Sequence, residues 1–248
     1  MSNYIIRTFS RMQASLAKRL FWRQHLAEAQ QQLRRLQIEL PTVEMMLAVS
    51  YLFQGKGYYQ TLGTKQNMLE LLGLANLLRE RPLHRVCEIG TFKGGTLFVL
   101  CQLAETDAHI VSVDLPHGQF GGGYNERSLP FFQSFRRPGQ TLHCLRGDSH
   151  ESGIRSEFER VLAGAQLDFL FIDGDHSYAG VKQDFEFYSR FVHRGGLIAF
   201  HDICQNAAHP DIEVHRFWQE IKSSCRHREF IETTNDRRKI GIGVLFND

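Results

Sequence analysis

The sequence predicts an α/β fold: a doubly wound, mostly parallel seven-stranded sheet with an N-terminal helical extension. Two observations carry this prediction. From residue 83 onward, short apolar runs typical of buried strands alternate with runs typical of helices, which indicates parallel strands covered on both faces. Residues 1–40 lack this alternation and show apolar side chains at helical spacing. A chain of 248 residues suits one such domain with an accessory segment.

The first forty residues are predicted to form one or two amphipathic helices that end near Pro41. They hold seven Lys or Arg and two acidic residues. An Arg-rich segment of this kind can imitate a transit peptide or a helix on a membrane surface. Packing on its own domain or on a second subunit is the simpler interpretation. We therefore expect residues 1–63 to be a helical extension for oligomerisation or a substrate lid, and residues 64–248 to be the main domain.

Between the extension and the sheet, the pattern predicts a short helix containing Val43, Leu47 and Tyr51, a mobile turn over Gly55–Tyr59, and a helix over 65–80 capped by Thr64. The seven strands are expected at 85–89, 110–113, 141–145, 167–172, 197–200, 229–232 and 242–246. The helices between them are expected at 94–105, 153–163, 178–192 and 213–224. Ligands of such sheets bind beyond the carboxyl ends of the parallel strands, so the chemistry should lie there.

A glycine turn follows the first strand and reads Glu88-Ile89-Gly90-Thr91-Phe92-Lys93-Gly94. Glycines let backbone approach a ligand, and a helix start offers free N–H groups. The spacing differs from the G-x-G-x-x-G of pyrophosphate sites. With an acidic residue before it, the turn favours a ligand that carries a cation and a carboxylate, such as S-adenosylmethionine (SAM). We expect Glu88, Gly90, Thr91 and Gly94 to bind this cofactor, together with Asp173 after the fourth strand; a structural turn is the alternative for the glycine segment.

Polar residues also follow the second and third strands. Asp114 ends the second strand, where a carboxylate can accept both ribose hydroxyls of a nucleoside. After the third strand, Asp148 or Ser149 can hydrogen-bond the adenine amino group. The rival interpretation of both positions is a helix cap or a solvated turn.

The fourth and fifth strands end in acids and histidines, which core packing does not explain. The fourth ends Ile172-Asp173-Gly174-Asp175-His176, and the fifth ends Phe200-His201-Asp202. Oxygen ligands from neighbouring strand tips suit Mg²⁺ or Mn²⁺. His201 is a third ligand, which favours Mn²⁺, or a partner that orients Asp202. A metal-free hydrogen-bonded cluster is the alternative.

These motifs resemble a known family. Residues 85–202 resemble the SAM-binding domain of class I methyltransferases, which has a Rossmann-like fold. The runs Asp173–Tyr178, Gly195-Gly196 and His201-Asp202 resemble a bacterial branch related to cephalosporin-hydroxylase-like proteins and macrolide sugar O-methyltransferases. The insert that begins at Asp114-Leu115-Pro116 also resembles that branch. The similarity covers roughly residues 64–246.

The resemblance implies roles for individual residues. In metal-dependent relatives, an acid after strand four and an acidic pair after strand five hold Mg²⁺, and these positions match Asp173, His201 and Asp202. The proposed base matches His176. This sequence departs from the pattern at His201, where an acid is expected, and this leaves open which metal binds and whether one binds.

The function expected from these residues is O-methylation of a small-molecule hydroxyl. His176 takes the acceptor proton near pH 7, and Asp173 assists. Acceptor contacts are expected from the Lys56–Tyr59 turn, the 203–212 loop and the 117–132 insert. The insert holds a candidate hinge, Gly121-Gly122-Gly123, and the aromatic residues Phe120, Tyr124, Phe131 and Phe132. They suit a sugar or a phenolic ring.

Three rival functions stay open: a nicotinamide-dependent oxidoreductase, a metal-dependent hydrolase or hydroxylase, and a non-catalytic SAM-binding scaffold. The net charge of +2 indicates no nucleic-acid partner. No apolar run approaches the roughly 20 residues of a membrane span, so no stable membrane anchor is expected. Five cysteines without C-x-x-C spacing favour a reduced, cytoplasmic protein, with a possible homo-oligomer through the N-terminal helices.

Overall fold

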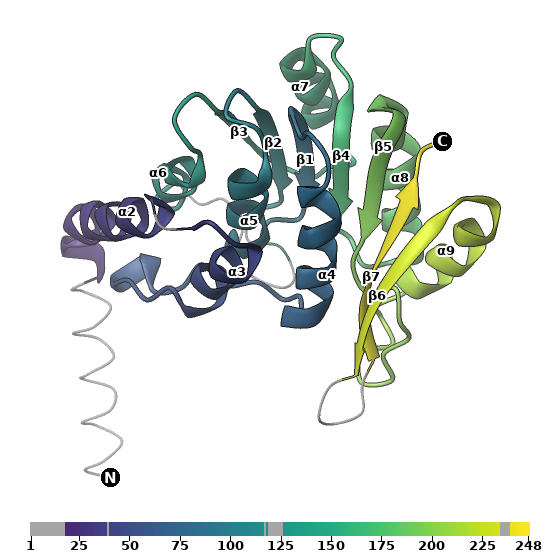
Figure 1. The fold of residues 1–248 in the computed structure, drawn as a ribbon, viewed down its shortest axis with the longest axis horizontal. Coiled ribbons are helices and arrows are strands. Elements are labelled where there is room, and N and C mark those ends of the chain that lie inside the picture. The colour runs from purple at the N-terminus through teal and green to yellow at the C-terminus, as the bar shows by residue number, and fades with distance from the viewer. Residues whose placement is uncertain (1–17, 39, 117, 119–125, 234–238) are drawn as a thin grey trace.

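The computed structural model describes residues 18–38, 40–116, 118, 126–233 and 239–248. These residues form a seven-stranded sheet in the order β3-β2-β1-β4-β5-β7-β6 (Figure 1). Its strands are β1 (Arg85–Ile89), β2 (His109–Asp114), β3 (Thr141–Arg146), β4 (Leu167–Ile172), β5 (Val192–Phe200), β6 (His227–Thr233) and β7 (Lys239–Phe246). The first five pair in parallel, and β7 runs antiparallel between β5 and β6. The predicted fold class is confirmed.

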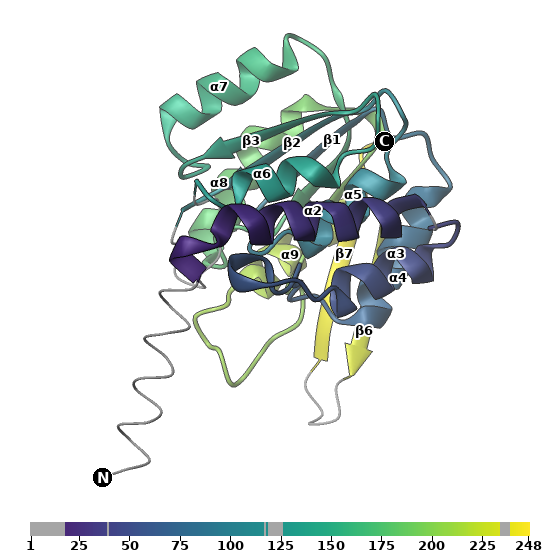
Figure 2. The ribbon, with the colours of Figure 1, turned by 90° about the vertical axis from the view of Figure 1, so that its left-hand side faces the viewer.

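Helices cover both faces of the sheet (Figures 1 and 2). One layer contains α2 (Trp22–Ile38), α3 (Val43–Leu52), α4 (Met68–Arg79), α5 (Gly95–Leu103) and α6 (Leu129–Phe132). The other contains α7 (Ser152–Leu162), α8 (Tyr178–Tyr188) and α9 (Val214–Ile221). Short 3₁₀ turns extend α6, α8 and α9.

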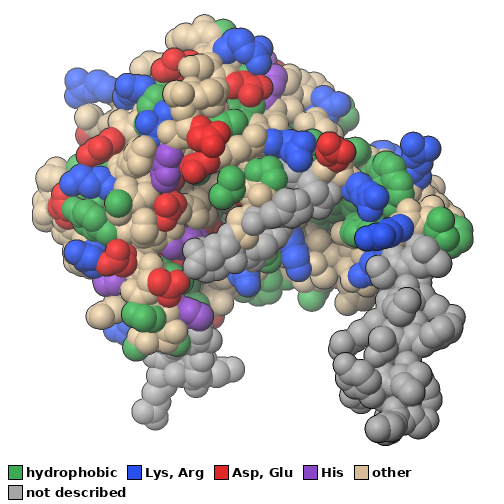
Figure 3. Space-filling view, turned by 180° about the vertical axis from the view of Figure 1, so that it is seen from behind, with side chains coloured by type: hydrophobic (Ala, Val, Ile, Leu, Met, Phe, Trp, Pro, Cys, Tyr) green, Lys and Arg blue, Asp and Glu red, His purple; other side chains and the backbone are tan. Residues whose placement is uncertain are grey.

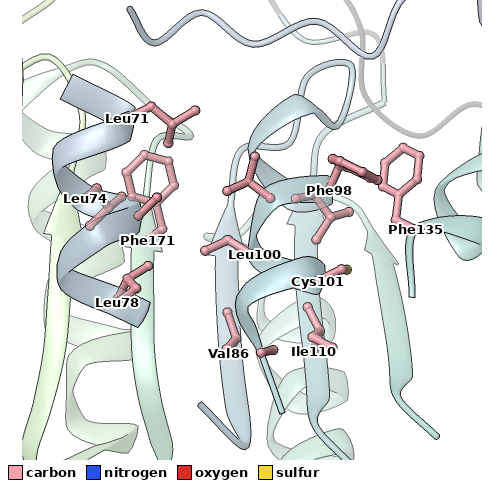
Figure 4. Close-up of a cluster of buried hydrophobic side chains, with 14 of the residues drawn as sticks. Leu71, Leu74, Leu78, Val86, Phe98, Leu100, Cys101, Ile110, Phe135 and Phe171 are labelled. Carbon is pink, nitrogen blue, oxygen red and sulfur yellow. The ribbon is translucent and has the colours of Figure 1, made fainter. Parts of the chain in front are cut away.

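Alternating strand residues divide the core between the two layers. In β4, Phe169 and Phe171 pack toward α4, while Leu170 and Ile172 face α8. Figure 4 shows Leu74 of α4 beside Phe171. All five of these side chains are buried. Because β4 is covered on both faces, its residues 169–172 form a continuous apolar run, which is the signal that predicted this strand.

The described part of the N-terminal extension packs on the domain. Ala29 and Leu33 of α2 are buried in the same core cluster as α4 and α5. The side chain of Gln30 donates to the carbonyl of Pro130 at 2.8 Å, and α2 lies beside α6 in both views (Figures 1 and 2). Residues 1–17 lie outside the described residues, and oligomerisation or a lid function stays a prediction.

Two local predictions need correction. Thr64 does not cap α4; Asn67 does, in a capping box with Glu70. The fifth strand begins at Val192, ahead of Gly195. Gly195, which was expected to precede the strand, lies within it with φ +89°, and the register between β4 and β5 shifts between Leu167 and Phe169.

Within the ranges that the structure describes, no helix combines the length and the apolarity that crossing a membrane requires.

We predict that Leu33→Ala lowers the free energy of unfolding by about 2–5 kcal/mol, because the side chain is fully buried and its loss leaves a cavity. Leu36 lies in the same helix but is 36% exposed, and Leu36→Ala should cost less than about 1 kcal/mol. Urea unfolding of both variants provides the measurement. Equal losses would show that α2 is not part of the domain core.

Candidate active site

A cleft of about 610 Å³ opens where the five parallel strands end. Each strand contributes the residues that directly follow it: Gly90 and Phe92, Asp114 and Leu115, Gly147–His150, Asp173–Ser177, and His201 with Asp202. Its volume suits a ligand of nucleoside size. Figure 3 shows the back of the molecule, where acidic and histidine side chains lie mostly on one half and Lys and Arg side chains are spread over both halves.

The glycine turn brings the tips of β1 and β4 into contact. Gly90 has φ +86°, and a Cβ there would lie 2.0 Å from the carbonyl oxygen of Asp173. Only glycine satisfies both constraints. Gly94 begins α5 with φ +82° and does not line the cleft; a Cβ there would meet the ring of Phe135 at 2.6 Å. A glycine is therefore needed at position 94 for packing against the core, whereas Gly90 borders the cleft.

Glu88 lies behind the turn and not in the cleft wall. Its side chain is fully buried and accepts a hydrogen bond from the hydroxyl of Thr91 at 2.9 Å and one from Ser112 at 3.3 Å. Burial, aided by the charges of Asp114 and Asp173, raises the pKa of Glu88 well above its usual range. A neutral carboxyl that supports Thr91 from below fits this environment better than a direct partner for a ligand cation.

Asp114 lies in the cleft as predicted. Its Oδ2 accepts the backbone N–H of Thr91 at 3.1 Å and that of Phe92 at 2.8 Å. Phe92 adopts a left-handed backbone, φ +52°, in this turn. Burial raises the pKa of Asp114 to about 6, and the backbone hydrogen bonds limit the rise. The cleft thus holds a carboxylate that titrates just below neutrality.

The segment after β3 also lines the cleft. Asp148 accepts the backbone N–H of His150 at 2.8 Å, and the carbonyl of Ser149 accepts the Tyr188 hydroxyl at 3.0 Å. The N-cap position of α7 is Glu151, so neither Asp148 nor Ser149 caps that helix. Sequence inspection missed His150, which lines the cleft and lies 3.2 Å from the buried Asp184.

Asp173, His176, His201 and Asp202 form one cluster. His201 Nδ1 lies 3.2 Å from Asp173 Oδ1 and 3.5 Å from Asp202 Oδ2. His176 Nδ1 lies 2.8 Å from the same Asp202 oxygen. Three of them offer ligand atoms within 4.8 Å of one another: Asp173, His201 and Asp202. The structure therefore brings together the residues predicted for the metal and for the base.

Opposite charges govern the cluster. Burial disfavours the charged forms of both histidines, yet the carboxylates of Asp173 and Asp202 outweigh it and raise the pKa of His176 and of His201. Burial opposes the ionised form of Asp202 too, but the two histidines hold its pKa far below the usual range. Asp202 also has φ +58°, an unfavourable backbone for a non-glycine residue.

Two further residues reach this cluster from the start of α4. The side chain of Gln66 donates to Asp173 Oδ2 at 2.6 Å, and Glu70 Oε1 lies 3.2 Å from His201 Nε2. The sequence indicates only that Glu70 lies three residues after Asn67, the residue that caps α4. Nothing in its spacing indicates that it reaches a strand tip more than a hundred residues away.

The predicted acceptor contacts divide into three groups. His209, Asp211 and Ile212 of the 203–212 loop line the cleft. The turn at residues 57–59 instead borders a second pocket of about 270 Å³, which shares Phe92 with the cleft.

The aromatic residues of the insert lie elsewhere. Phe131 and Phe132 are buried in the core and lie outside the cleft, at the border of the second pocket. Phe120, Tyr124 and Gly121-Gly122-Gly123 lie outside the described residues.

The sheet order and the antiparallel β7 give this protein the fold of the class I methyltransferases. Residues 87–203, just under half of the chain, match the family described as a methyltransferase domain. Residues 87–203 are therefore a methyltransferase domain, and the predicted methyltransferase class is confirmed at this level. Its assignment to the branch near cephalosporin-hydroxylase-like proteins stays a prediction.

Solved structures share the fold. The O-methyltransferase TomG from Streptomyces achromogenes, involved in tomaymycin synthesis and solved with SAM, is 16% identical, with 90% of each chain covered and a TM-score of 0.56. An O-methyltransferase from Bacillus cereus in complex with S-adenosylhomocysteine is 13% identical, with 84% of this chain and 93% of that chain covered and a TM-score of 0.56.

One curated relative comes from Acanthamoeba polyphaga mimivirus and is an uncharacterised protein. It is 32% identical over 132 residues, which are 53% of this chain and 57% of that protein. The match thus spans little more than half the length of the relative.

We predict that Glu88→Gln retains affinity for S-adenosylhomocysteine within about twofold, because glutamine keeps the shape and the neutral state of the buried carboxyl. The raised pKa of Glu88 means that the folded wild type loses stability as the pH rises through that pKa, and the variant should not. Calorimetric titration and urea unfolding at neutral and alkaline pH measure both effects. A tenfold loss of affinity would instead indicate a direct ion pair with the ligand.

We also predict that S-adenosylhomocysteine binds about tenfold more weakly at pH 5 than at pH 7. The pKa of Asp114 is about 6, and its protonated form no longer accepts two hydroxyls. Asp114→Asn, which does not titrate, should bind more weakly than wild type at pH 7 and show a flatter pH profile. Identical pH profiles for the two proteins would remove Asp114 from the ribose site.

Proposed function

We propose that this chain transfers the methyl group of SAM to a hydroxyl of a small-molecule acceptor. One observation carries the proposal: a single cleft joins a nucleoside-type set of side chains, Asp114 and Asp148, to the His176–Asp202 pair. The two sets belong to different strands, and only their common edge of the sheet brings them together.

The residues present fit SAM. The turn at Gly90 offers close backbone approach, and Asp114 presents a carboxylate whose orientation two backbone N–H groups hold. Asp148 and Ser149 border the same space. When bound, SAM supplies an activated methyl group on a positively charged sulfur, and the cleft supplies acids that favour this charge.

The residues also fit a divalent cation. Asp173 Oδ1, Asp202 Oδ2 and His201 Nδ1 face one another, and the other ring nitrogen of His201 points to Glu70. A carboxylate on the far nitrogen is the usual partner of a metal-binding histidine. The mixed oxygen and nitrogen set suits Mn²⁺ or another transition metal, and Mg²⁺ less well. Such a cation would lower the pKa of a hydroxyl bound to it.

His176 is the proposed base. Asp202 lies on its Nδ1, orients the ring and stabilises the imidazolium that forms when the acceptor loses its proton. Because the pKa of His176 is raised above its ordinary value, its neutral form gains population as the pH increases through that pKa. Turnover should therefore increase with pH over this range.

The proposed acceptor is a sugar or phenolic hydroxyl of the natural-product type. The O-methyltransferase TomG, which shares the fold, is involved in tomaymycin synthesis, and this supports a small molecule over a macromolecule. His209, Asp211 and Ile212 are the described candidates for acceptor contacts in the cleft. A cytoplasmic location and a homo-oligomer through the N-terminal helices belong to the same proposal.

The rival functions have less support. A hydrolase, a hydroxylase or a nicotinamide-dependent oxidoreductase would not explain why residues 87–203 match a methyltransferase domain. A non-catalytic SAM-binding scaffold does not explain why His176 and Asp202 form a half-buried pair in the cleft.

We predict that His176→Ala retains S-adenosylhomocysteine binding and lowers kcat by about 10²–10⁴-fold, the usual contribution of a general base. Isotope transfer from labelled SAM to a panel of sugar and phenolic acceptors measures turnover, and calorimetry measures binding. His215→Ala is the matched control, because His215 does not line the cleft. An unchanged kcat for His176→Ala would exclude it as the base.

A further inference from the structure

The segment just before α4 and the first turn of α4 place two buried polar side chains, Gln66 and Glu70, against the cluster at the tips of β4 and β5. Gln66 is 4% exposed and Glu70 is 1% exposed. Gln66 donates to Asp173 Oδ2, and Glu70 lies on the Nε2 side of His201. This segment precedes the methyltransferase domain match, so the match does not include it.

The amide of Gln66 has a defined orientation. Its Oε1 accepts the Thr96 hydroxyl at 2.7 Å and that of Thr64, which directs Nε2 toward Asp173. Because a carboxylate only accepts, this hydrogen bond occupies Asp173 Oδ2. Asp173 Oδ1 then faces the remaining ligand candidates.

Glu70 acts on His201 in the same way. An acceptor on Nε2 favours the ring form that keeps its proton there when a cation replaces the proton on Nδ1, and the Nδ1 lone pair is then directed into the space that Asp173 and Asp202 also face. Gln66 and Glu70 thus each engage the outer side of one ligand candidate. The inner atoms of both candidates face the same space.

Helix capping does not account for Glu70. Its Oε1 accepts the backbone N–H of Asn67 at 2.6 Å, which a partly exposed side chain would do as well. Glu70 is instead fully buried, and its Oε2 has no hydrogen-bond partner within the described residues. Burying such a group is costly, and a carboxylate that supports a cation-binding histidine offers a reason for it.

We infer that Gln66 and Glu70 are positioning residues that hold Asp173 and His201 in the arrangement that binds a divalent cation. The inference rests on the metal site of the proposed function. It extends the site from the strand tips to α4. In the sequence, α4 comes before β1, and the strand tips of the site come after β4 and β5.

The test is Mn²⁺ binding, measured by electron paramagnetic resonance on the full chain saturated with S-adenosylhomocysteine. Glu70→Met and Gln66→Met should each weaken Mn²⁺ binding by about 10–100-fold, the usual effect of losing such a partner. Glu70→Gln keeps an acceptor for His201 and for Asn67, and it should recover most of that loss. Asn67→Ala is the control, because it removes the cap of the same helix and leaves both contacts intact.

The outcomes separate the two proposals. Wild-type affinity for Mn²⁺ in Glu70→Met and Gln66→Met, or an equal loss in Asn67→Ala, would overturn the inference. A wild-type protein that binds S-adenosylhomocysteine but no Mn²⁺ would also overturn the inference. The proposal of methyl transfer would then stand without a metal. A wild-type protein that does not bind S-adenosylhomocysteine counts against the proposed function. In that case, Mn²⁺ binding by the same variants, measured without S-adenosylhomocysteine, still decides the inference. If Glu70→Met does not fold, Gln66→Met and Glu70→Gln decide it.

Discussion

The approach of β1 to β4 at Gly90 is the constraint on which the site depends. A single Cβ at this position would collide with the carbonyl of Asp173, so the glycine lets the two strand tips meet. That contact sets the nucleoside side of the cleft, around Asp114, directly beside the acidic side, around Asp173. A wider separation would leave two shallow sites that no single ligand could bridge.

Crowding of carboxylates is the second constraint, and it follows from the first. Burial and the charge of Asp173 raise the cost of ionising Glu88 and Asp114, and the protein meets this cost differently at each position. Glu88 is buried and favours its neutral form, while Asp114 is stabilised by backbone N–H groups and titrates near neutrality. Around Asp202, two histidines balance the negative charge. The environment, and not the residue type, therefore assigns each acid its role.

Much of the site was predictable because parallel strands end at one edge. The short apolar runs located the strands, and the polar residues that follow them, such as Asp114, Asp173 and His201, had to gather there. The prediction was weaker where it depended on the direction in which a side chain points from its strand or turn. Glu88 precedes the glycine turn in sequence, yet the alternation of side chains along β1 places it beneath the turn, and Gly94 contacts aromatic rings of the core.

The sequence by itself determined the order of strands and helices, the position of the cleft and the chemical types that line it, because these follow from local hydrophobic periodicity and from residues next to strand ends. Only the tertiary structure decided which groups are neutral, which are paired and which come from outside the sheet. Gln66 and Glu70 illustrate the difference. Their contacts depend on how α4 packs across β4 and β5, and such packing joins residues whose separation along the chain carries no local signal.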